Sequence, residues 1–230
     1  MPKIYKNWLW SRSRHLVYYY RPDSYAANDI QQIMQVEEQA LAHIQQILAV
    51  QYDDDISIYI YNSRDDAGWQ GAHAYSRTET VDAIYAADQH SIGLPGVSAH
   101  ELAHVITWNG IGDPMVQVLS EGVAVAMDGV WHSRTDTITN LDRWAEKFLV
   151  DGSLSLFSDL IRHPDDFPSG VLYPVSGSFV TYLLEIYPVD QFKQLFARAT
   201  PENFQSVIQE IYGKPYGEIV GGWQESVRTQ

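Results

Sequence analysis

Segments with the composition of β-strands all come before Gln89 in this sequence, and helical spacing prevails after it. One amphipathic helix is expected among the strands, because apolar residues recur at helical intervals over 30–48 and Asp23 or Ser24 could cap its start. Strands followed by helices indicate the α+β class. We therefore predict a single domain over 1–230, with an α+β lobe at 1–113 and a mostly helical lobe at 114–230. Four runs rich in aromatic and β-branched residues are the expected strands: HLVYYY (15–20), ISIYIY (56–61), AHAYS (72–76) and VDAIYAAD (81–88).

The charge of the chain limits its partners. It has 230 residues, 45% of them hydrophobic, and a formal net charge of −14. This composition suits a globular protein with a substantial core. Nucleic acids and anionic membranes both require a basic face, so the acidic balance argues against either as a partner.

The sequence contains no cysteine, which excludes disulfides, thiolate metal sites and cysteine nucleophiles. Any metal must therefore be bound by His, Asp or Glu. No run approaches the roughly 18 apolar residues of a membrane-spanning helix, and the start shows no signal peptide. We expect a cytoplasmic protein by default, although a secreted chain trimmed of its leader would look the same. The oligomeric state stays open.

The stretch GVSAHELAHVITW (96–108) carries the main candidate site, on a helix expected over residues 97–109. His100 and His104 are four residues apart and so share one helix face. Glu101 is rotated by roughly 100° from His100 and borders that face. Zinc bound by imidazoles lowers the pKa of its bound water, and an adjacent carboxylate can accept the proton. This is the chemistry of an HExxH motif. The alternative is an ordinary helix that carries two histidines and an acid.

A third ligand is available in LSEGVAVAMDG, on a helix expected over residues 116–129. Glu121 stands there among apolar residues, and a carboxylate is rarely buried without a partner. A metal ion would be such a partner. The alternative is a Glu beside Gly122 that caps the helix or faces solvent. Asp128, on a similar face, could accept a hydrogen bond from a ligand or lie on the surface.

HELAH followed by LSEG resembles the gluzincin branch of zinc metallopeptidases, which includes thermolysin and the M1-type aminopeptidases. The spacing is closer to that of small peptidase-MA-like domains. The resemblance implies a zincin-like fold, with an N-terminal mixed sheet, the HExxH helix and a helical C-terminal lobe. It implies zinc bound by His100, His104 and Glu121, with Glu101 as the general base. The flanking segments HLVYYYRPDS and YPVSGSFVTYLLEIYP are similar to the family as well.

In related gluzincins a Tyr or His outside the zinc ligands stabilises the oxyanion, and Tyr173 matches that position best. Pro174 departs from the family pattern, and a tyrosine ring packed in the core is the alternative. His73, His132 and His163 are weaker candidates for the same role. By the same resemblance, 81–88 would be the edge strand against which an extended peptide pairs.

These features predict a zinc-dependent peptidase whose partner is a peptide or protein substrate. Glu101 would deprotonate the water that attacks the peptide carbonyl and then protonate the leaving amine. The sequence has no GxMEN-like segment before the zinc helix, which slightly favours endopeptidase action. Two other functions remain open: a catalytically silent zincin-fold module for binding or regulation, and a zinc hydrolase of a non-peptide amide.

Overall fold

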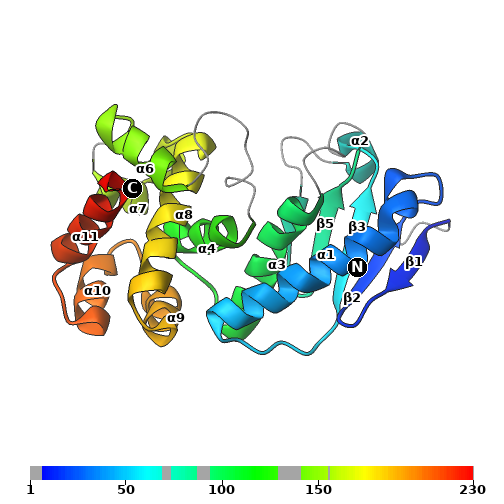
Figure 1. Cartoon of the computed structure of the whole chain (residues 1–230), viewed down its shortest axis with the longest axis horizontal. Helices are drawn as coiled ribbons and strands as arrows, with labels where there is room; N and C mark the ends of the chain where they lie inside the picture. Colours follow the sequence, from blue (N-terminus) through cyan, green and yellow to red (C-terminus); the bar gives the residue numbers. More distant parts are fainter. Residues whose placement is uncertain (1–6, 69–73, 87–93, 129–140, 155, 230) are drawn as a thin grey trace. The chain divides into compact units, whose positions relative to one another are not determined.

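The computed structural model describes residues 7–68, 74–86, 94–128, 141–154 and 156–229. The chain divides into two compact units, Met1–Gln46 with Val50–Gly110 and Ile47–Ala49 with Ile111–Gln230 (Figure 1). The first unit combines a sheet with helices, and the described part of the second is helical. The α+β prediction is therefore confirmed, while the single catalytic domain stays a prediction.

The first unit contains a five-stranded mixed sheet in the order β1-β2-β3-β5-β4. The three central strands are parallel, and the two outer strands pair antiparallel with their neighbours. The strands are β1 (Leu9–Arg12), β2 (Leu16–Tyr20), β3 (Ile56–Tyr61), β4 (Ala74–Ser76) and β5 (Thr80–Ile84).

In the described part of this unit the helices are α1 (Tyr25–Leu48, apart from its last two residues), α2 (Arg64–Ala67) and α3 (Leu94–Gly110). α1 is the crossover that joins the parallel strands β2 and β3, and it lies across the sheet (Figure 1). Its start agrees with the predicted cap, because Ser24 Oγ accepts a hydrogen bond from Ala27 N at 3.0 Å and caps the first turn. Alternate residues of β2 are buried, as expected for a strand with one face against a core.

The order of the strands corrects the expectation for residues 81–88. β5 pairs with β3 on one side and with β4 on the other, so it is not the edge strand. The chain turns back at once between β4 and β5, with Arg77 N donating to Thr80 O at 2.8 Å. This hairpin leaves the short β4 at the edge. The expected strand also extends over 87 and 88, which lie outside the described residues.

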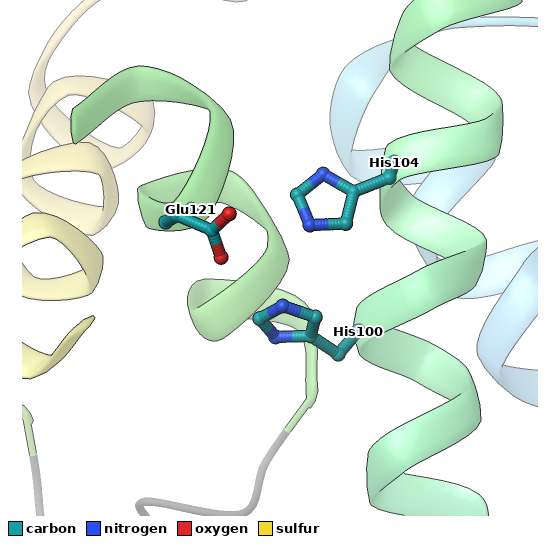
Figure 2. Close-up of side chains that lie close together, drawn as sticks. All are labelled: His100, His104 and Glu121. Atoms are coloured by element: carbon teal, nitrogen blue, oxygen red, sulfur yellow. The ribbon is translucent and has the colours of Figure 1, made fainter. Parts of the chain in front are cut away.

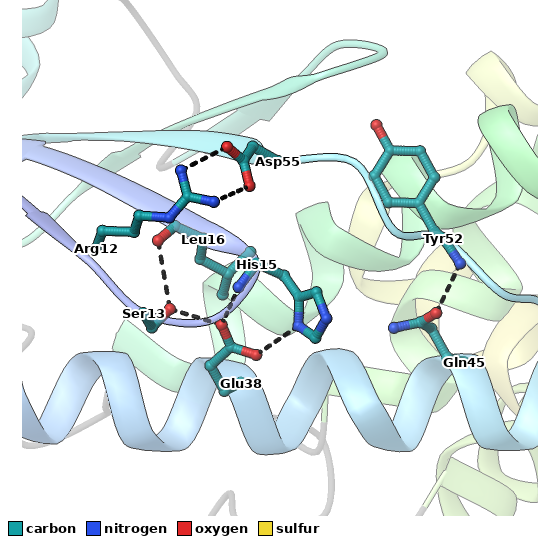
Figure 3. Close-up of polar contacts among 8 residues, drawn as sticks. All are labelled: Arg12, Ser13, His15, Leu16, Glu38, Gln45, Tyr52 and Asp55. Carbon is teal, nitrogen blue, oxygen red and sulfur yellow. Dashed lines mark hydrogen bonds and ion pairs between the residues drawn. The ribbon is translucent and has the colours of Figure 1, made fainter.

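A cluster around Glu38 fastens the β1–β2 turn to α1 (Figure 3). Its Oε1 accepts hydrogen bonds from Ser13 Oγ at 2.6 Å and His15 N at 2.7 Å, and its Oε2 lies 3.0 Å from His15 Nδ1. Burial raises the pKa of Glu38, but the bonds from Ser13 and His15 outweigh that effect and hold the pKa below its ordinary value of 4.5. The charged carboxylate thus stabilises the fold.

We expect Glu38→Gln to destabilise the first unit by about 1–2 kcal/mol at pH 7, because an amide oxygen replaces a charged acceptor. The native pKa is depressed, so this stabilisation is complete above the unfolded value of 4.5 and is lost as the pH falls through the native pKa. Urea unfolding of both proteins from pH 7 to pH 3 measures the difference. Glu79→Gln, at an exposed carboxylate, is the control. A gap between wild type and Glu38→Gln that stays constant over this range would contradict the assignment.

The described residues of the second unit form helices and their connections (Figure 1). None of the helices in the described part of the whole chain is long and apolar enough to cross a membrane. The elements are α4 (Gln117–Asp128), α6 (Leu141–Val150), α7 (Phe157–Arg162), a 3-10 turn η1 (Pro164–Asp166), α8 (Ser169–Ile186), α9 (Val189–Arg198), α10 (Phe204–Tyr212) and α11 (Tyr216–Arg228).

α4 and α8 approach closely because each has a glycine at the contact. A Cβ atom on Gly122 would lie 2.5 Å from Val180 Cγ2 and 2.6 Å from the backbone oxygen of Ser176. A Cβ atom on Gly177 would lie 2.6 Å from Val125 Cγ1. Neither glycine needs a special backbone conformation; each is required by the close approach. The contact fixes α4, which carries Glu121, against α8.

Trp223 of α11 fills the core of the same unit. Its side chain is fully buried and its ring contacts those of Phe157 at 4.9 Å and Phe179 at 5.5 Å. Its Nε1 donates to Ser178 Oγ at 2.9 Å, and Ser178 Oγ in turn donates to Asp142 Oδ1 at 2.5 Å. The polar edge of the indole is thus satisfied, as a buried Trp requires.

Candidate functional site

α3 presents the histidines from a buried helix. Leu102, Ala103, Val105 and Ile106 are all fully buried, so the helix is surrounded by protein on most of its circumference. Its C-terminal end is tied to the β4–β5 turn by Asn109 Nδ2, which donates to Thr78 O at 2.5 Å. The side chains that α3 carries are therefore held in a fixed place relative to the sheet.

His100 and His104 project from the same face of α3, as their spacing predicted (Figure 2). Their ring centroids lie 5.0 Å apart with an interplanar angle of 78°. His104 is only 6% exposed, and its ring stacks on that of Trp108 at 5.6 Å. The stacking restricts the orientation of the imidazole.

Glu121 lies half-buried in the first turns of α4, flanked by buried apolar residues. Its carboxylate and the imidazoles of His100 and His104 each offer one ligand atom, and these atoms lie within 4.8 Å of one another (Figure 2). In the described part of the chain, this group could hold a metal ion.

The donor set fits zinc. Two imidazole nitrogens and one carboxylate oxygen are ligands that zinc accepts, and three protein ligands leave one position open for water or substrate. Ligand atoms around a tetrahedral zinc ion with bonds of about 2.1 Å lie about 3.4 Å apart. The ligand atoms found here lie within 4.8 Å of one another.

Glu101 lies beside the histidines in sequence and makes its own contact. Its Oε2 accepts a hydrogen bond from Ser76 Oγ at 2.5 Å, and both side chains are partly buried. Ser76 is the last residue of β4, so the contact joins the edge of the sheet to α3. The carboxylate keeps a second oxygen, Oε1, with which it can accept a proton.

Tyr173 lies near the start of α8, which begins at Ser169 and continues through Pro174. Pro174 lies inside the helix, where it removes one backbone hydrogen bond, and the helix nevertheless continues to Ile186. The ring of Tyr173 packs against the buried pair Val125 and Leu141. Its part in oxyanion stabilisation stays a prediction.

The structure describes only some of the weaker candidates for oxyanion stabilisation and for hydrogen bonding to a ligand. His73 and His132 lie outside the described residues. His163 is exposed at the junction of α7 and η1, where its backbone N–H donates to Asp159 O at 2.8 Å. Asp128 is the last residue of α4 and is half-buried, and its role as a hydrogen-bond acceptor for a ligand stays a prediction.

Two residues beside the candidate site were missed from the sequence. Trp108 could have been found, because it stands four positions after His104 and so one turn further along the same face. Ser76 could not, because its contact with Glu101 depends on which strand forms the edge of the sheet.

Comparisons with known proteins support the fold. The sequence matches no family model and no curated protein. Its structure is similar to a crystal structure of an M1 zinc metallopeptidase from Deinococcus radiodurans, with a TM-score of 0.57 and 13% sequence identity. The similarity covers 93% of this chain and 49% of the other, so the chain spans about half the length of that enzyme. The fold is zincin-like.

Proposed function

We propose that this zincin-like protein is a zinc-dependent peptidase. The convergence of His100, His104 and Glu121 carries the proposal, because the ligand atoms of all three lie within 4.8 Å of one another. The fold of a zinc metallopeptidase supports it. The combination of two histidines and a downstream glutamate is that of the gluzincins, and we propose that the whole of 1–230 acts as one catalytic domain.

Each side chain would have a defined task. His100 and His104 would bind the metal through imidazole nitrogens from one helix face, and Glu121 would bind it through a carboxylate oxygen. Zinc, when bound, would polarise a peptide carbonyl and make water a better nucleophile at neutral pH. Glu101 would accept the proton of the attacking water and later donate it to the leaving amine. In a secondary role, the hydroxyl of Tyr173 is proposed to donate a hydrogen bond to the oxygen of the attacked carbonyl.

The metal content of the protein tests this proposal directly. Wild-type protein purified without added metal should contain stoichiometric zinc, and His104→Ala should lose most of it, because two ligands no longer fill the coordination sphere. His43→Ala, which removes an exposed histidine on α1, is the control and should keep its zinc. Elemental analysis of the dialysed proteins gives the zinc-to-protein ratio.

Wild-type protein without stoichiometric zinc would refute the metal site. Stoichiometric zinc without hydrolysis of a broad peptide library would refute the peptidase function and support a binding module. Hydrolysis of non-peptide amides alone would assign the same zinc site to a different substrate class.

A further inference from the structure

The hydrogen bond between Ser76 and Glu101 joins a strand to the residue that we propose as the general base. Ser76 Oγ donates to Glu101 Oε2 at 2.5 Å, a short distance that is typical of a hydroxyl bound to a charged carboxylate. Both residues belong to the first unit. The contact thus forms within one compact body.

The fold holds the two partners of this bond in register. Ser76 pairs with Val81 at the end of β4, in the antiparallel hairpin with β5. Asn109 Nδ2 donates to Thr78 O, two residues beyond Ser76, and also to Val105 O at 2.8 Å. The hairpin is therefore fastened to α3 at a second point. The position of Ser76 against Glu101 is set by the backbone of both elements.

We propose that Ser76 is a positioning residue that fixes the carboxylate of Glu101, an inference that rests on the peptidase function proposed above. A glutamate side chain has three rotatable bonds, and an unrestrained carboxylate samples many orientations. A hydroxyl that holds Oε2 fixes the plane of the group and leaves Oε1 free to meet a proton. A base held in the productive orientation speeds proton transfer without changing how tightly the substrate binds.

The test compares Ser76→Ala with Ser76→Thr, which keeps a hydroxyl and suits a β-strand. Against a peptide selected from a library with the wild-type enzyme, Ser76→Ala should lower kcat about tenfold or more and leave KM within about twofold. Ser76→Thr should restore most of kcat. Thr78→Ala removes an exposed hydroxyl from the same hairpin and should match the wild type. All four proteins should be fully folded at the assay temperature and should have the same zinc content.

A double variant shows whether Ser76 acts through Glu101. If it does, adding Ser76→Ala to Glu101→Gln should lower kcat no further, because the base is already absent. Additive losses, or a Ser76→Ala enzyme with wild-type kcat, would overturn the proposal. So would a folded, zinc-containing Ser76→Thr protein that is as slow as Ser76→Ala.

Crystal structures of wild type and Ser76→Ala supply a readout that is independent of activity. The wild-type structure should keep the bond from Ser76 to Glu101, and the variant should show the carboxylate in a new or split orientation. An unchanged carboxylate in Ser76→Ala would refute the positioning role. Loss of the proposed function has a different signature: wild-type protein would then hydrolyse no peptide, whatever the crystal structures show of Glu101.

Discussion

Glu101→Gln is expected to lower kcat by about a hundred- to ten-thousand-fold, the range over which a positioned general base contributes. Glutamine has nearly the same shape as glutamate, and its amide oxygen can still accept the bond from Ser76. It cannot accept a proton at neutral pH. Steady-state kinetics on a peptide substrate measure the loss, and elemental analysis should show unchanged zinc, because Glu101 is not among the three converging ligands.

Glu185→Gln, at an exposed carboxylate on α8, is the matched control and should keep the wild-type kcat. An unchanged kcat in Glu101→Gln would remove this residue from the chemistry. A parallel loss of zinc and activity would instead make Glu101 a ligand, contrary to the role assigned to it.

Trp223→Ala should destabilise the helical unit by about 3–5 kcal/mol, because it leaves a large cavity among Phe157, Phe179 and the neighbouring helices. It also removes the donor to Ser178. Urea unfolding followed by circular dichroism measures the loss without depending on tryptophan emission. Trp223→Phe keeps an aromatic ring but loses the hydrogen bond to Ser178, so it should destabilise the unit less than Trp223→Ala does.

Trp10→Ala provides the comparison for this effect, since Trp10 is 67% exposed and its replacement should change stability by less than about 0.5 kcal/mol. Equal unfolding midpoints for Trp223→Ala and Trp10→Ala would contradict the packing of the helical core. Because the chain has two compact units, the transition of the helical unit should be analysed separately from that of the first unit.

The fold class was readable from the sequence because strands and helices differ in the period of their apolar residues. ISIYIY corresponds to β3 without a shift of either end. β1 was missed, because three of its four residues are exposed and LWSR has no burial alternation. The order of the sheet was beyond local patterns, since β5 lies between β3 and β4 through pairings that only the folded chain reveals.

In the candidate site, too, local spacing predicted some features, and others depend on the folded chain. The shared face of His100 and His104 follows from helix geometry alone, and the structure agrees with it. The approach of Glu121 to them was predicted from its apolar neighbours and the resemblance to gluzincins, and it agrees with the grouping of the three ligand atoms. Ser76 and Glu101 are 25 positions apart in the sequence and lie on different elements, so no spacing rule connects them.

Gly122, which follows Glu121, offers a way to recognise distant relatives of this chain. Its missing Cβ avoids the backbone oxygen of Ser176, which no side-chain rotation can move aside. A homologue that keeps the contact of α4 with α8 must therefore keep Gly after the glutamate and a small residue at the position of Gly177. A search profile that couples Glu-Gly on one helix to a small residue on a later helix would reject many chance matches to a five-residue motif.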